Sequence, residues 1–154
     1  DGKTSFLCLY PQKNGFYKDR NASSLVLKLR VKGDGEKPAF TALLTGDVEA
    51  EGEMRMLEEE EAKYSRELLE GCDILKTAHH GSDTSTTEEF LDAAAPSLAL
   101  ISCGKNNSYG HPHKEVLQRF EERGIPVLIT TDCGAVTIRA KNKKIRVEPF
   151  LDVD

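Results

Sequence analysis

Residues 73–83, DILKTAHHGSD, set two adjacent histidines at the end of an apolar segment that is typical of a buried strand. A glycine and a serine follow directly. The chain has only 4 histidines, so two of them occupy a single step of the backbone. Alone, such a pair is equally compatible with a surface position at a strand end. Its function has to be judged together with the segments on either side.

The bulk composition predicts one globular domain over residues 1–154, with 38% apolar and 31% charged residues. No apolar run approaches the roughly 18 residues that a membrane-spanning helix needs. The net charge of −5 argues against a protein that coats nucleic acid by charge alone. It does not exclude an enzyme whose metal ions supply positive charge. The 4 cysteines form no close pair, which favours single buried thiols over a zinc cluster or a disulfide framework.

Hydrophobic periodicity gives the order of the elements. Strands are predicted over 5–10, 23–31, 39–47, 72–78, 97–103, 125–131, 135–140 and 144–150. Helices are predicted over 49–71, 84–96 and 113–124, the second with Thr86 and Glu89 as a capping box. From residue 73 the order is β-α-β-α-β, followed by strands alone. This order predicts an α/β (α+β) fold, with a mixed sheet flanked by helices and antiparallel strands at its edges.

Three polar segments follow predicted strands: Thr45-Gly46-Asp47, His79-His80-Gly81-Ser82 and residues 106–112, NNSYGHP. Ligands bind at strand ends in layered α/β proteins because loops converge there on a rigid sheet. Carboxylate and imidazole together suit zinc, manganese or iron, and the scattered cysteines are not needed. The pattern predicts a metal site, with a pair of ions as the arrangement suited to phosphoester hydrolysis.

Each candidate residue then has a role. Asp47 is the predicted bridging ligand, although it could instead cap the next helix. His79 and His80 would supply one or two ligands. His111 would be a further ligand or would protonate the leaving oxygen, although it could be a turn residue. We predict that Ser82 and Asn107 donate hydrogen bonds to substrate oxygens, and that His113, just inside a helix, is exposed and has no such role.

The ordered set LLTGDVEAEGE, DILKTAHHGSDTST, ISCGKNNSYGHPHKEVLQRF and ITTDCGAVTI resembles the metallo-β-lactamase-fold domain of ComEC-type competence proteins. The resemblance runs from about Asn21 to Ile138. It implies the αββα sandwich of metallo-hydrolases and divalent metal ions, zinc or manganese, two per complete site. Asp47 matches a metal-binding motif of the family and its bridging role, His79 and His80 match HHGS, and His111 matches GHP.

The resemblance also implies a biological setting. The parent would be an integral protein of the bacterial cytoplasmic membrane that takes up DNA. This domain would lie on the extracytoplasmic face and act as a nuclease on the single strand that is not imported. Two alternatives stay open: a free-standing metallo-hydrolase of a small phosphoester, and a non-catalytic scaffold domain of the same fold.

One departure from the family is large, because the His-x-His-x-Asp-His motif that supplies ligands to both metals does not occur in the sequence. The chain therefore resembles the C-terminal portion of the domain and is expected to come from a longer protein. We expect this fragment alone to bind metal poorly and to be inactive, whereas its parent would be an active hydrolase. A lone half would expose an apolar sheet face, so we also expect a homodimer or exchange of elements.

Overall fold

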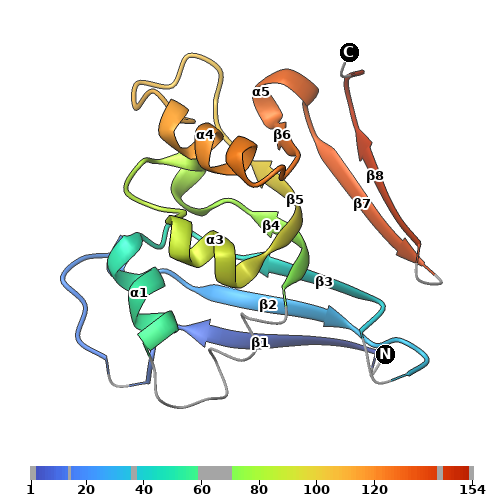
Figure 1. The fold of residues 1–154 in the computed structure, drawn as a ribbon, viewed down its shortest axis with the longest axis horizontal. Coiled ribbons are helices and arrows are strands. Elements are labelled where there is room, and N and C mark those ends of the chain that lie inside the picture. The colour runs from blue at the N-terminus through green and yellow to red at the C-terminus, as the bar shows by residue number, and fades with distance from the viewer. Residues whose placement is uncertain (1–2, 14, 36–37, 59–70, 142–143, 153–154) are drawn as a thin grey trace.

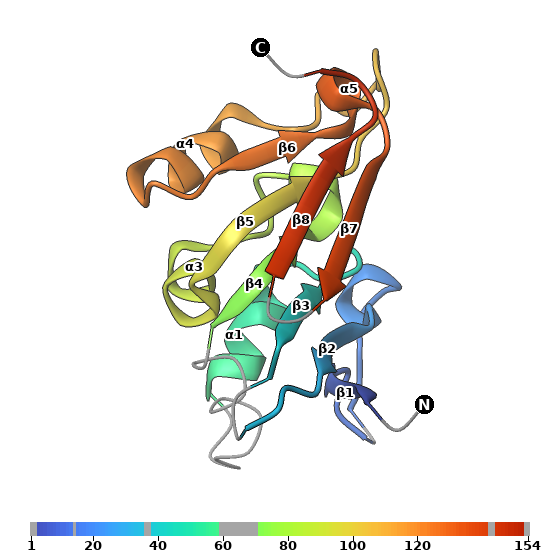
Figure 2. The same cartoon turned by 90° about the vertical axis from the view of Figure 1, so that its right-hand side faces the viewer.

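The structure is a computed structural model that describes residues 3–13, 15–35, 38–58, 71–141 and 144–152. A six-stranded mixed sheet forms its centre, with helices on one face and a β-hairpin on the other (Figures 1 and 2). The sheet contains β1 Thr4–Tyr10, β2 Val26–Val31, β3 Phe40–Leu44, β4 Cys72–Lys76, β5 Pro96–Ile101 and β6 Val127–Ile129. The helices are α1 Ala50–Glu58, α3 Glu88–Ala94, α4 Lys114–Glu122 and the short α5 Thr130–Cys133. The hairpin consists of β7 Val136–Lys141 and β8 Lys144–Pro149, and two 3₁₀ turns are η1 Asn21–Ser23 and η2 Ala78–Gly81.

The strands lie in chain order, antiparallel from β1 to β3 and parallel from β3 to β6. Ile74 of β4 is opposite Ala42 of β3 on one side and Leu98 of β5 on the other. This register aligns the three parallel strands without a large offset. Their carboxyl ends therefore meet at one edge of the sheet, and the loops that follow them start side by side.

The helix-covered face holds the larger core. Leu75 of β4 and Ile101 of β5 are fully buried there against Phe90 of α3 and Phe120 of α4. Met56 is the buried apolar side chain of α1. Because α1, α3 and α4 each lie between two neighbouring parallel strands and pack on the same face, one apolar stripe per helix suffices to cover it.

Within the described ranges, only the hairpin covers the opposite face. Ile138 and Val147 pack against a smaller core of Phe40, Ala42 and Ile74. Toward the β1 edge this face is open, with Phe6 62% and Leu44 37% exposed. These exposed side chains agree with the packing deficit that led us to expect self-association, which stays a prediction.

The predicted fold class is confirmed, and three local expectations are wrong. The C-terminal strands pair with each other and do not extend the main sheet. The strand predicted over 125–131 ends at Ile129, and the chain turns into α5 where Thr130 Oγ1 bonds the backbone of Cys103. The cap of α3 is Thr87, whose Oγ1 accepts the Phe90 amide at 3.3 Å. Of the helix predicted over 49–71, the structure describes α1, and residues 59–70 lie outside the described residues.

Among the described residues, none of the helices has the length and apolar character required to cross a bilayer. The longest helices, α1 and α4, have 9 residues each and carry charged side chains along one face.

Replacing a side chain at the centre of the helix-covered core tests this architecture. Leu75→Ala is expected to lower the free energy of unfolding by about 2–5 kcal/mol, because a fully buried leucine leaves a cavity. The control Leu25→Ala, at a side chain that is 52% exposed, should change it by about 0.5 kcal/mol or less. Urea denaturation measures both. Equal decreases in the free energy of unfolding of the two variants would contradict the assignment of Leu75 to the core.

Candidate functional site

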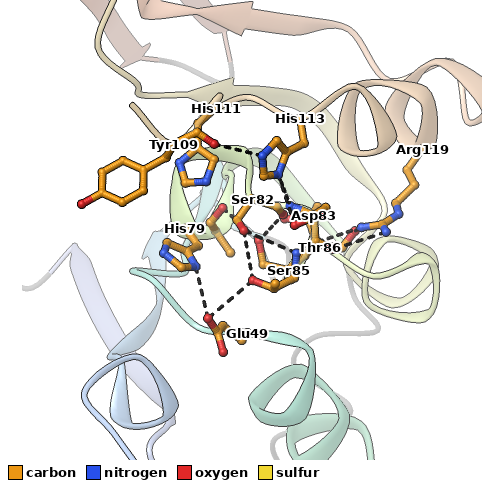
Figure 3. Close-up of polar contacts among 12 residues, drawn as sticks. Glu49, His79, Ser82, Asp83, Ser85, Thr86, Tyr109, His111, His113 and Arg119 are labelled. Atoms are coloured by element: carbon orange, nitrogen blue, oxygen red, sulfur yellow. Dashed lines mark hydrogen bonds and ion pairs between the residues drawn. The ribbon is translucent and has the colours of Figure 1, made fainter. Parts of the chain in front are cut away.

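The three polar segments singled out in the sequence converge at the carboxyl ends of β3, β4 and β5 (Figures 1 and 3). Asp47 follows β3, the histidine pair lies in η2 after β4, and His111 lies in the loop after β5. All 4 histidines of the chain are here, because His113 joins them at the start of α4. Ring centroids of His79 and His111 are 5.6 Å apart, and those of His111 and His113 are 5.0 Å apart.

The backbone of η2 is strained at both histidines. His79 and His80 have φ values of 43° and 57°, in the left-handed region that costs a residue with a Cβ about 1 kcal/mol or more. Gly81 continues the turn with φ 84°, and a Cβ there would lie 2.7 Å from Cβ of Pro112. The glycine therefore lets the turn after β4 approach the loop after β5. Two consecutive histidines in this conformation are best explained by a need for their side chains at this point.

His80 has a defined tautomer. Its Nδ1 lies 2.6 Å from the carbonyl oxygen of Ser102, which can only accept, so Nδ1 carries the proton. Nε2 is then the lone-pair nitrogen, and it lies 3.5 Å from Oδ1 of Asp47. An imidazole held by a backbone carbonyl in this way is the usual orientation of a metal-binding histidine.

His79 faces a different carboxylate. Its Nδ1 lies 3.4 Å from Oε1 of Glu49, and Thr84 Oγ1 donates to the same oxygen at 3.5 Å (Figure 3). Glu49 stands two residues after Asp47, and the sequence analysis did not select it. The short spacing Asp-Val-Glu after a strand end was the available signal, since alternate residues of an extended segment face the same side.

His111 stacks on Tyr109, with ring centroids 5.6 Å apart at an interplanar angle of 21°. Burial lowers the pKa of His111, and the neighbouring imidazoles of His113, His79 and His80 lower it further, whereas Asp83 raises it. The neutral ring that this favours is the form that can bind a metal ion.

The expectation that His113 is exposed is wrong, because the side chain of His113 is only 29% exposed. Its Nδ1 accepts the backbone N–H of Asp83 at 2.9 Å, and its Nε2 donates to the carbonyl of Tyr109 at 3.1 Å. Its backbone N–H donates to Gly81 at 2.9 Å. The same Nδ1 lies 3.1 Å from Oδ1 of Asp83, but a nitrogen that accepts an N–H has no proton to form an ion pair. His113 therefore ties the η2 turn to the loop that carries His111.

Two predicted substrate-binding residues are engaged inside the protein. Asn107 Nδ2 donates to the carbonyls of Gly104 and His111 at 2.9 and 2.7 Å, and its Oδ1 accepts the N–H of His111 at 2.9 Å. Ser82 is 4% exposed, and its Oγ lies 3.0 Å from Oγ1 of Thr84. In this structure both residues shape the loops, and their contact with a substrate stays a prediction.

The segment that follows the histidine pair is held from two sides. Glu53 of α1 is fully buried and accepts the N–H groups of Thr86 and Thr87 at 2.6 and 2.8 Å. Arg119 of α4 donates to the carbonyls of Ser85 and Thr86 at 2.8 and 3.1 Å (Figure 3). A carboxylate and a guanidinium thus satisfy opposite ends of the same peptide groups, which fixes the loop despite the left-handed φ of 56° at Thr86.

The donor set fits a metal ion in part. Two ligands of one tetrahedral zinc are roughly 3.4 Å apart when each bond is about 2.0–2.1 Å. The separation of 3.5 Å between Asp47 Oδ1 and His80 Nε2 agrees with that spacing. However, no group of three His, Cys, Asp or Glu side chains among the described residues could hold a metal ion. The described part of the chain therefore provides a matched pair of ligands and does not complete a metal centre.

Comparison with known proteins gives consistent relatives. A stretch of 124 residues is 40% identical to ComE operon protein 3 of Bacillus subtilis and covers 80% of this chain. Competence protein ComA of Neisseria gonorrhoeae is 33% identical over 86% of the chain, and recombination protein 2 of Haemophilus influenzae is 32% identical over 70%. The chain is related to a family of competence proteins.

The chain corresponds to only a small part of these competence proteins. The matched segments span 14%, 18% and 13% of the three relatives. No model of a known protein family matches the chain. The relation to competence proteins agrees with the resemblance drawn from the motifs.

The buried carboxyl group of Glu53 gives a testable pH dependence. Burial raises the pKa of Glu53 above its ordinary value of 4.5, while the N–H groups of Thr87 and Thr86 oppose the shift. A raised pKa means that the folded state binds the proton more tightly, so this contribution to stability is present below pH 4.5 and lost as the pH rises through the folded pKa. The stability advantage of wild type over Glu53→Gln should therefore shrink as the pH rises above 4.5, as measured by urea denaturation.

Glu51→Gln is the matched control on the same helix. A hydrogen bond from Lys18 lowers the pKa of the exposed Glu51, so its contribution is present above pH 4.5 and lost as the pH falls. The two variants should show opposite trends with pH. If the stability advantage of wild type over Glu53→Gln grew with pH, the hydrogen bonds from the two N–H groups would lower the pKa of Glu53 by more than burial raises it.

Proposed function

We propose that this chain forms part of the active site of a metal-dependent hydrolase that cuts phosphodiester bonds of DNA, within a competence protein. The observation that carries the proposal is the position of every histidine of the chain at one sheet edge beside Asp47. Packing of the sheet does not by itself require four histidines at strand ends, two of them on strained backbone. The names of the competence relatives support DNA as the substrate.

Asp47 and His80 would hold one ion, and the predicted ligands His79 and His111 would serve a second, because no three of these side chains are placed to hold the same ion. A bound divalent ion, or a pair of them, would supply an activated water and neutralise charge on the phosphate. The chain's own residues orient the ligands: Ser102 O fixes the ring of His80, and His113 fixes the loop of His111. Oε1 of Glu49 lies 3.4 Å from Nδ1 of His79.

The remaining ligands would come from outside the described residues. We infer a metallo-β-lactamase fold, of which this sheet and its helices would form one half. In the part of the chain that the structure describes, helices cover only one face of the sheet, and the other carries a small hairpin and exposed Phe6 and Leu44. Both observations support a second layer in the longer protein over the open part of that face, toward the β1 edge and beside the hairpin. This layer would also bring ligands to the shared edge.

Metal content and nuclease activity test the proposal. We would measure both for this chain and for a version that includes the residues preceding it in its gene, using single-stranded DNA with added manganese or zinc. We expect the longer protein to hold two metal ions per site and to cut DNA, and this chain to do neither. Asp47→Asn and His80→Ala in the longer protein should reduce activity by more than the roughly 10–100-fold that loss of an outer-shell partner costs.

Asp34→Asn provides the control, because Asp34 is an exposed residue of the turn between β2 and β3, at the other end of the sheet from the site. It should leave activity unchanged. A longer protein that binds metal but hydrolyses only small phosphodiesters would favour the small-substrate alternative. One that binds no metal would make the domain a scaffold and overturn the proposal.

A further inference from the structure

The C-terminal hairpin carries a charge opposite to that of the rest of the chain. Residues 136–149 contain five Lys or Arg residues and one acidic residue, a formal charge of +4. Because the whole chain has a charge of −5, the other residues together carry −9. Such segregation within one short element is unexpected if the basic residues serve only solubility.

The strand register sorts these residues onto one face. Ile138 is opposite Val147 and Ala140 is opposite Ile145. Ile138 and Val147 pack against the main sheet, beside which the hairpin runs (Figure 2). On the outward face, Arg139 is directly opposite Arg146, and Lys141 is directly opposite Lys144. We call these four cations the basic face. The packing of Ile138 and Val147 holds the hairpin in place, so the basic face is displayed by a fixed element.

Two neighbouring pairs of like charges are unfavourable in a hairpin, since charges directly opposite each other repel. Glu148 offsets part of the repulsion, with Oε2 3.0 Å from Nε of Arg139 and Oε1 3.7 Å from Nη1 of Arg146. One carboxylate shared between two guanidiniums still leaves a net charge of +3 on this face. The arginine side chains are 70% and 78% exposed and therefore accessible to a partner. A polyanion would relieve the remaining repulsion.

An aromatic side chain extends the same face. Phe150 follows Glu148 at the alternating position and is 80% exposed, with its Cβ against Gly134. This end of the hairpin adjoins α5, whose first residue Thr130 bonds the backbone of Cys103 at the start of the loop that carries His111. Exposed aromatic rings beside aligned cations are the combination that binds single-stranded nucleic acid, by base stacking and phosphate contacts.

We propose that the basic face and Phe150 bind single-stranded DNA and lead it toward the edge of the sheet where the histidines lie. This inference deepens the proposed function by naming the surface that holds the substrate. It requires neither metal nor hydrolysis. Binding in the presence of EDTA therefore separates a failure of this inference from a failure of the proposed activity.

Fluorescence anisotropy with a labelled oligothymidylate in EDTA is the test. Each phosphate contact to a single strand contributes about −0.7 to the slope of log K against log salt, so four contacts predict a slope of about −3. Lys141→Gln/Lys144→Gln should reduce the slope by about 1.4 and weaken binding roughly tenfold at moderate salt. Phe150→Ala should weaken it at least about fivefold with little change in slope, because stacking is not ionic.

The control Lys13→Gln/Lys32→Gln removes the same charge from exposed lysines elsewhere and should leave binding within about twofold of wild type. Circular dichroism confirms that each variant is folded. Equal weakening in the control pair would show binding by overall charge and would overturn the proposal. It would equally be overturned if the oligonucleotide did not bind, or if phosphatidylserine vesicles bound through the basic face and the oligonucleotide did not.

Discussion

The parallel pairing of β3, β4 and β5 is the constraint on which the rest of the structure depends. It sets the carboxyl ends of three strands at one edge, so that Asp47, the histidine pair and His111 meet although they are far apart in the sequence. Parallel strands need a crossover between them, and the three crossover helices return over one face and bury the larger core there. The same arrangement leaves the second face to a hairpin and to exposed apolar side chains.

At this edge, local strain is balanced by contacts from separate elements. The left-handed residues of η2 and Thr86 cost free energy, and they persist because α1 and α4 hold the surrounding backbone through Glu53 and Arg119. His113 adds a link to the loop after β5. Removing the Glu53 carboxylate from water costs free energy. Its hydrogen bonds to Thr86 and Thr87 hold that segment in one conformation. A backbone held from several sides in this way keeps the histidine side chains of the site in fixed positions.

The sequence predicts the fold class and the meeting of the three motifs, because apolar periodicity and strand-end position are local signals. It does not predict the links between them. Glu53 lies 33 and 34 residues from its partners Thr86 and Thr87, and no pattern in the chain joins positions at that separation. Periodicity predicts a surface position for His113, because its partners Asp83 and Tyr109 lie in two loops that only the folded chain brings together. The spacing of Thr86 and Glu89 predicts a capping box. In the structure, however, the N–H of Thr86 donates to Glu53, and Thr87 caps the helix by accepting the N–H of Phe90.

The central claim is that backbone groups at this edge set the orientation of the imidazoles, so that His80 presents a lone pair to Asp47. Two-bond ¹H–¹⁵N correlation spectra of this chain at neutral pH test it most directly, because they report which ring nitrogen carries the proton. Our account predicts opposite tautomers in one protein: Nδ1–H for His80, bonded to Ser102, and Nε2–H for His113, bonded to Tyr109. If His80 carries its proton on Nε2, or if both rings exchange freely between tautomers, the edge is not organised as described.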